Sequence, residues 1–145
     1  MDDDPYDLER FVAAQDSDAT VERAIEELRL GHKTSHWMWF VFPQIAGLAQ
    51  SPTSRRFAIS SLGEARLYLA HAVLGPRLIE CAGIVARTEA RSAVQILGDI
   101  DAQKLHSSMT LFVRAAPGEP VFQQVLDRYF DGQADAATDE RVARV

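Results

Sequence analysis

Apolar residues recur along the chain at the three- and four-residue spacing of amphipathic helices, separated by short polar, glycine or proline breaks. Val21, Ile25 and Leu28 repeat at i, i+4 and i+7, and Gly31 follows as a helix-terminating residue. Leu105 and Met109 begin a similar stripe further along the chain. No second segment alternates convincingly enough to pair as a strand. The pattern predicts an all-α, single compact domain of seven or eight short helices, with no sheet beyond a stray bridge.

Capping residues mark several of the expected helix starts. Asp4-Pro5 and Ser51-Pro52 each place a capping side chain before a proline of the first turn. Ser61 and Glu64 stand three residues apart, as in a capping box. His71 falls in the last turn of the following helix, where a protonated imidazole would complement the helix dipole.

The domain is expected to span residues 1–131. From Gly132 the composition becomes polar and rich in alanine, so residues 132–145 are predicted to form a loosely docked polar tail. A chain of 145 residues is long enough for one domain with its own core.

The segment Gly31–Gln44, with the sequence GHKTSHWMWFVFPQ, places polar groups directly against aromatic ones. Thr34 or Ser35 is expected to cap a short helix through Phe42. Tryptophan, phenylalanine and valine also suit a strand. The lack of a partner strand favours the helix, and we expect the segment to pack at the centre of the domain.

The start of this segment suggests an anion site. If Thr34 or Ser35 caps the helix, the amides near His36 and Trp37 face outward, with Lys33 just before them. Alternatively, Lys33 is solvated and His36 only forms a hydrogen bond at a helix start. His32 and His36 also have the spacing of two zinc ligands, but Lys33 lies between them, no glutamate base accompanies them, and we do not predict a metal site.

A second polar cluster precedes Phe112. Lys104, Ser107 and Ser108 share one helix face, and hydroxyl residues are mediocre helix formers. Contact with a phosphate or ribose would explain them, and so would a close helix crossing. The sequence leaves these two interpretations equal.

These two clusters form our candidate site. Aromatic faces stack bases or sugars, although most of Trp37, Trp39, Phe40 and Phe42 are expected in the core. We predict a concave pocket that binds a small anionic or nucleotide-like molecule, with catalysis unassigned. The alternative is a helical protein–protein interaction module that uses the same patch. The predicted site residues are Lys33, His36, Trp37, Gln44, Ser107 and Ser108.

Composition narrows the possible partners. The net charge of −6 and the pI near 5.1 argue against broad nucleic-acid binding. No apolar run reaches the ~20 residues of a membrane span. The single cysteine, Cys81, is expected to be a buried, inert thiol, which favours a reducing compartment. We therefore predict a soluble, cytoplasmic protein with no cofactor. The sequence leaves its oligomeric state open.

The residues His36-Trp37-Met38-Trp39, followed by Phe42-Pro43-Gln44, form a specific signature. With this signature, the chain resembles a bacterial and fungal family of unknown function, domain-of-unknown-function family 1810 (DUF1810), over nearly its whole length. The resemblance implies a mainly helical fold and no activity. Some family members carry the label calpastatin, but a disordered, repeated inhibitor has little in common with this apolar, helix-patterned chain. The residues that carry the resemblance include Tyr6 to Leu8, Arg10-Phe11, Gly31 to Gln44, Gly47-Leu48, Ser51, Ala70-His71, Leu74 to Leu78, Lys104-Leu105 and Ser107 to Phe112.

Overall fold

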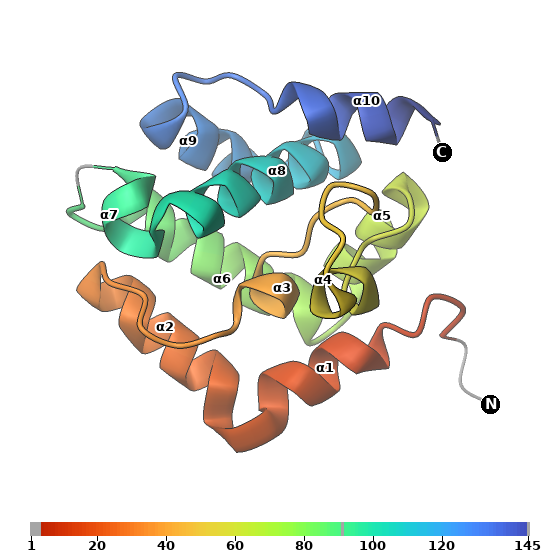
Figure 1. The fold of residues 1–145 in the computed structure, drawn as a ribbon, viewed down its shortest axis with the longest axis horizontal. Helices are drawn as coiled ribbons and strands as arrows, with labels where there is room; N and C mark the ends of the chain where they lie inside the picture. The colour runs from red at the N-terminus through yellow and green to blue at the C-terminus, as the bar shows by residue number, and fades with distance from the viewer. Residues whose placement is uncertain (1–3, 91, 145) are drawn as a thin grey trace.

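The computed structural model describes residues 4–90 and 92–144, and it is helical along its length (Figure 1). The all-α class predicted from the sequence is confirmed. Within the described residues, pairing of extended segments is limited to a parallel bridge between Ile45 and Ile59. The helices are α1 (Glu9–Asp16), η1 (Ser17–Ala19, a 3-10 turn), α2 (Thr20–Leu30), α3 (Met38–Val41), α4 (Pro52–Arg56), α5 (Leu62–Ala70), α6 (Leu74–Arg87), α7 (Ala93–Leu97), α8 (Asp99–Ala115), α9 (Pro120–Tyr129) and α10 (Ala136–Arg144).

Helices α6 and α8 are the two longest, and the others are arranged around them. Helix α9 packs against both, α5 also contacts both, and α10 lies along α8. Helices α1 and α2 form a V, and α2 lies against α6 (Figure 1). The short helix α3 sits in front of this arrangement, between the V and α8, and contacts α1.

The segment Gly31–Gln44 divides into two halves with different environments. Trp37, Met38 and Phe42 are almost completely buried in one continuous hydrophobic core. His32, Thr34 and His36 are exposed. The expectation of a central segment therefore holds only for its second half, and this division places polar residues at the surface directly beside buried aromatic ones.

His71 is the C-terminal cap residue of α5, and its side chain serves the start of α6. Its Nδ1 accepts hydrogen bonds from the amides of Val73 (3.1 Å) and Leu74 (3.2 Å), and its carbonyl accepts one from Gly75 (3.1 Å). This is the geometry of a capping residue at the start of α6. Helix α5 ends at Ala70, so His71 does not lie in the last turn of the helix, where the sequence pattern placed it.

Residues 132–145, predicted as a polar tail, contain α10. Asp135 caps this helix, because its carboxylate accepts hydrogen bonds from the amide and hydroxyl of Thr138. Asp135 and Thr138 are buried, and Arg114 of α8 pairs with Asp139 at 2.8 Å. Helix α10 is thus attached to α8 through polar contacts at its first turn.

No single helix in the described ranges has both the length and the apolar composition to cross a membrane. Only α5 and α6 taken together meet those two criteria, and they are bent by 92° where they meet.

Candidate ligand-binding groove

Two cavities that share a wall lie beside the first half of α8, and they bring the two polar clusters of the sequence together. The first, which we call the lysine cavity, has a volume of about 490 Å³ and lies between residues 33–39 and α8. The second, the apolar cavity, has a volume of about 500 Å³ and extends toward α10. Asp99, Ile100 and Lys104 line both. We call the two cavities together the groove.

Both lysines of the sequence lie in the lysine cavity and face the same carboxylate. Lys33 Nζ lies 2.9 Å from Oδ2 of Asp101, and Lys104 Nζ lies 3.9 Å from its Oδ1. The Lys33 side chain is 9% exposed and that of Lys104 is 18% exposed. Every other residue in the Lys+Arg count of this chain is an arginine. Both of its lysines therefore meet at the same carboxylate, that of Asp101.

An aromatic ring lies within cation–π distance of each ammonium group. Lys33 Nζ lies 5.1 Å from the centroid of the Trp37 ring, and Lys104 Nζ lies 5.0 Å from that of Trp39. Cation–π contact at these distances orients the charges without neutralising them. The backbone amide of Lys33 also donates to the carbonyl of Ile96 at 2.7 Å, which attaches residues 31–37 to α7. The two charges are therefore held in place by contacts other than their carboxylate.

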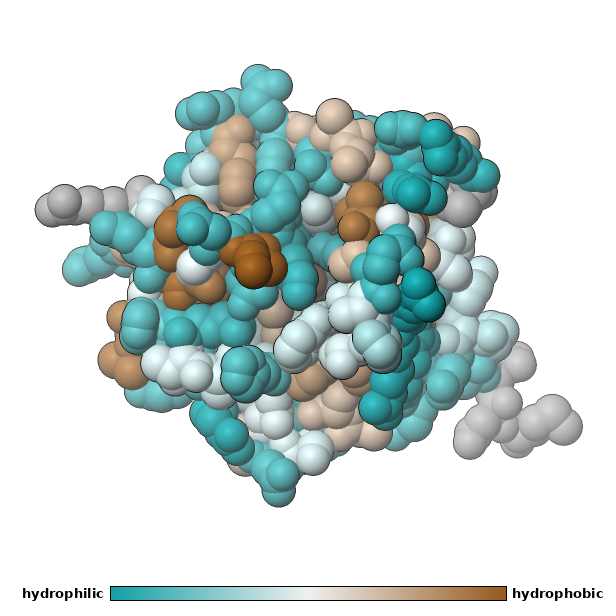
Figure 2. Space-filling model, in the orientation of Figure 1, coloured by the Kyte–Doolittle hydropathy of each residue, from teal (hydrophilic) through white to brown (hydrophobic). Residues whose placement is uncertain are grey.

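The apolar cavity has a different chemistry. Leu48, Ala49, Ile100 and Ala137 form much of its wall, and Ile100 is 75% exposed. Figure 2 shows apolar atoms exposed over α7 and the start of α8, surrounded by polar ones. Gln44 and Gln103 place carboxamides at the same wall, so the cavity combines apolar surface with groups that both donate and accept hydrogen bonds.

Four of the six predicted site residues line the groove. Lys33 and His36 line the lysine cavity, and Gln44 and Ser107 line the apolar one. The Ser107 hydroxyl donates to the carboxylate of Asp135 at 3.1 Å. Of the two interpretations of this hydroxyl, a helix crossing is therefore the one that its contacts favour.

The other two predicted residues, Trp37 and Ser108, lie in the core instead. Both are 0% exposed and neither lines the groove. Trp39, which the helical pattern places nearly opposite Trp37, faces the lysine cavity in its stead. The Ser108 hydroxyl has no hydrogen-bond partner within the part of the chain that the structure describes.

Sequence analysis also missed the residue that occupies the expected anion site. The amides of Thr34 (2.8 Å) and Ser35 (3.0 Å) donate to the carboxylate of Glu27, as do the Ser35 hydroxyl and Trp37 Nε1. Burial raises the pKa of Glu27, but these hydrogen bonds outweigh burial and lower it to about 2. The two amides just before those that the pattern left free are thus satisfied from within the chain. In the sequence, the one signal for a buried Glu27 is its position beside Leu28, in the apolar stripe of α2.

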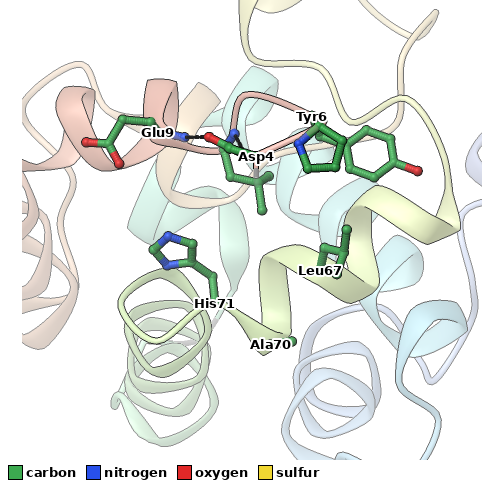
Figure 3. Close-up of a pocket in the computed structure, with 8 residues that line it drawn as sticks. Asp4, Tyr6, Glu9, Leu67, Ala70 and His71 are labelled. Carbon is green, nitrogen blue, oxygen red and sulfur yellow. Dashed lines mark hydrogen bonds between the residues drawn. The ribbon is translucent and has the colours of Figure 1, made fainter. Parts of the chain in front are cut away.

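A third cavity, of about 460 Å³, lies where residues 4–9 pass over the junction of α5 and α6 (Figure 3). Asp4, Tyr6, Glu9 and His71 are its polar residues, and the side chains of Asp4 and His71 already serve helix starts. The Asp4 carboxylate accepts from the amides of Leu8 (2.7 Å) and Glu9 (3.0 Å), and these bonds lower its pKa. The described residues that line it include no lysine or arginine, so it lacks the pair of cations that the groove has.

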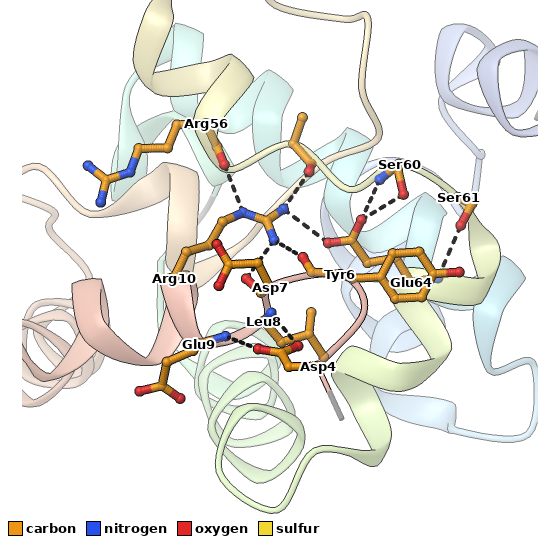
Figure 4. A network of polar contacts seen from close by, with 11 residues as sticks. Asp4, Tyr6, Asp7, Leu8, Glu9, Arg10, Arg56, Ser60, Ser61 and Glu64 are labelled. Carbon is orange, nitrogen blue, oxygen red and sulfur yellow. Dashed lines mark hydrogen bonds and ion pairs between the residues drawn. The ribbon is translucent and has the colours of Figure 1, made fainter. Parts of the chain in front are cut away.

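Beside that cavity, Arg10 joins residues 6–10 to the segment before α5 (Figure 4). Its guanidinium contacts Glu64 at 3.0 Å and donates to the carbonyls of Arg56 and Ala58, among others. Ser61 caps α5 as expected, accepting from the amide of Glu64 at 3.1 Å. The reciprocal half of the predicted capping box is absent, because the Glu64 carboxylate bonds to Ser60 and Arg10. Ser92 and Gln95 form a complete capping box at α7.

The chain folds as a single helical domain with a surface groove lined by two lysines, a tryptophan and apolar side chains. A family model described as "Protein of unknown function (DUF1810)" matches residues 5–142, so the chain belongs to that family. The chain is also similar to a conserved hypothetical protein, Rv1873 from Mycobacterium tuberculosis. Its crystal structure shares 49% sequence identity and a TM-score of 0.93, over 97% of this chain and 99% of that one. A search of curated proteins found no match.

Proposed function

We propose that this protein binds a small organic anion of nucleotide-like size and shape in the groove. One observation carries the proposal: a single concave surface is lined by Lys33, Trp39 and Lys104, which come from distant parts of the sequence. The ammonium groups of the two lysines are oriented by contacts with aromatic rings. The chain has one cysteine, Cys81, which cannot form an internal disulfide, and this fits the cytoplasmic location that we also propose.

The size and the composition of the groove suit such a ligand. Small-molecule sites usually measure about 300–1,000 Å³ and combine apolar walls with a few oriented polar groups. Each cavity falls in that range. An acidic group of the ligand would face the lysines, and a planar or apolar part would face Ile100 and Leu48.

A helical interaction module is the second candidate, and the exposed apolar side chains favour it. Ile100 is 75% exposed and Val94 is 48% exposed. A stable protein interface needs ~800 Å² per partner, with aromatic anchors at its centre. Because Trp39 faces a cavity and does not project from the surface, we prefer the small-molecule hypothesis.

A thermal-shift screen against nucleotides, phosphosugars and organic acids tests the proposal. A ligand that binds only the folded protein raises the midpoint by an amount that grows with its concentration. Each compound that does so is repeated with Lys104→Ala, which removes one ammonium from the groove, and with Arg144→Ala, whose guanidinium pairs with Glu140 on the exposed surface of α10. We expect the shift to disappear in the first variant and to persist in the second. A shift that survives Lys104→Ala, or silence across the library, contradicts the proposal.

A further inference from the structure

The carboxylate of Asp101 stands where the acidic group of a ligand would have to bind. Its two oxygens face different lysines, Lys33 at 2.9 Å and Lys104 at 3.9 Å. Both lysine side chains are largely buried, and buried ammonium groups without an anion are energetically costly. Asp101 therefore supplies the anion that these two cations require.

The three groups in ion-pair contact do not balance in charge. Two ammonium groups face one carboxylate, which leaves an excess of one positive charge. Asp99 also lines the cavity, but it is exposed and forms no ion pair with any of the described residues. A monocarboxylate that took the place of Asp101 would leave the same excess, whereas a dianion would remove it.

Phosphate monoesters are dianionic near neutral pH, because their second pKa is about 6. The oxygens of a phosphoryl group are also strong acceptors for ammonium groups. The organic part of an ester bound there would lie toward Ile100, which lines both cavities, and toward Leu48 and Ala137 in the apolar cavity.

We propose that the groove takes an organic phosphate monoester, whose dianion displaces the carboxylate of Asp101 from between Lys33 and Lys104. Asp101 lies in the first turn of α8, where a carboxylate that has rotated toward solvent stays favourable beside the helix N-terminus. Asp101 acts as an internal competitor, so that an anion of single charge gains little by replacing it. This inference rests on the proposed function and adds to it the ligand class and the residue that sets selectivity.

Isothermal titration calorimetry at pH 7.5 with phenyl phosphate, benzoate and inorganic phosphate tests this inference. For the wild type we expect phenyl phosphate to bind at least tenfold more tightly than benzoate, and inorganic phosphate more weakly than phenyl phosphate. Asp101→Asn removes the competitor and should tighten binding of phenyl phosphate by about tenfold, the equivalent of one charge-assisted hydrogen bond. The ratio of the affinity for phenyl phosphate to the affinity for benzoate should also be smaller in Asp101→Asn than in the wild type.

Asp99→Asn is the matched control, because it removes the same charge from the same cavity without releasing a lysine. We expect it to change affinity less than threefold. Asp101→Ser, which also removes the carboxylate and keeps a small polar side chain in the first turn of α8, repeats the test if the asparagine variant unfolds.

Different failures point to different errors. Weaker binding of phenyl phosphate in both Asp101 variants would show that Asp101 positions the lysines, and it would overturn the displacement. Equal affinity of the wild type for benzoate and phenyl phosphate would overturn the ligand class, as would no binding of phenyl phosphate by a protein that binds another compound of the screen. If no compound of the screen and none of these three anions binds, the proposed function itself fails.

Discussion

Ser107 and Ser108 are neighbours on α8, but their hydroxyl groups lie in different environments. The Ser107 hydroxyl donates to the buried carboxylate of Asp135, whereas the Ser108 hydroxyl is buried without a partner among the described residues. A buried hydroxyl without a hydrogen bond destabilises the fold, while loss of a bond to a buried charge leaves that charge less satisfied.

We therefore expect opposite effects from the two alanine substitutions. Ser107→Ala should lower the free energy of unfolding by about 1–2 kcal/mol, because Asp135 loses a donor. Ser108→Ala should leave it unchanged or raise it by up to ~1 kcal/mol, because it removes an unsatisfied group and alanine favours helix. Urea denaturation measures both variants. A loss of stability in Ser108→Ala as large as that in Ser107→Ala would contradict this account.

Single residues of the site were only partly predictable. Lys33, His36, Gln44 and Ser107 line a cavity, and their role in binding a ligand stays a prediction. Trp37 and Trp39 could not be told apart by composition, since both rings suit a pocket wall. Which of them is buried depends on where α3 begins, and the short helix Met38–Val41 begins later than a cap at Thr34 or Ser35 predicts.

At the scale of elements, one carboxylate organises the connection between α2 and α3. Glu27 accepts hydrogen bonds from the Thr34 and Ser35 amides, the Ser35 hydroxyl and the Trp37 indole, which holds Lys33 at the edge of the groove. The ordinary pKa of 4.5 falls to about 2 in the folded protein. The ionised form therefore stabilises the fold at neutral pH, and this stabilisation is lost as the pH falls from about 4.5 toward 2.

We expect acid to reveal this contribution. The free energy of unfolding should fall by ~3 kcal/mol between pH 4.5 and pH 2 through Glu27 alone, since one pKa unit corresponds to about 1.4 kcal/mol. Glu27→Gln should be less stable at pH 7 and should show a shallower decline. Glu26→Gln, at an exposed neighbouring position, should follow the wild type. Curves for Glu27→Gln and wild type that stay parallel across this pH range would contradict the role given to Glu27.

Helices were more predictable than their caps. The i, i+4 and i+7 stripes placed most helices, because an amphipathic face reports burial directly. The partners of Glu64 and His71 were not predictable in the same way. Glu64 bonds to Arg10, which lies 54 positions earlier in the chain, and the side chain of His71 bonds to amides at the start of the helix that follows it.

At the scale of the whole molecule, the groove results from the packing of α8 against residues 31–49. The sequence shows two polar clusters, but no local pattern states that Lys33 and Asp101 come within 2.9 Å of each other. That contact depends on how α7 turns the chain back to place α8 beside the Lys33 segment. The central claim concerns this contact: the two lysines of the chain form one anion site.

Selective ¹³C labelling of lysine tests that claim most directly, because the sequence contains only Lys33 and Lys104. The labelled protein should give two lysine side-chain signals, and each can be assigned with Lys33→Arg and Lys104→Arg. On titration with phenyl phosphate, or with an anion identified by the screen, both signals should move together and saturate with one dissociation constant. If an anion that binds the protein leaves either lysine signal unchanged, or moves the two with different dissociation constants, Lys33 and Lys104 do not form a single site.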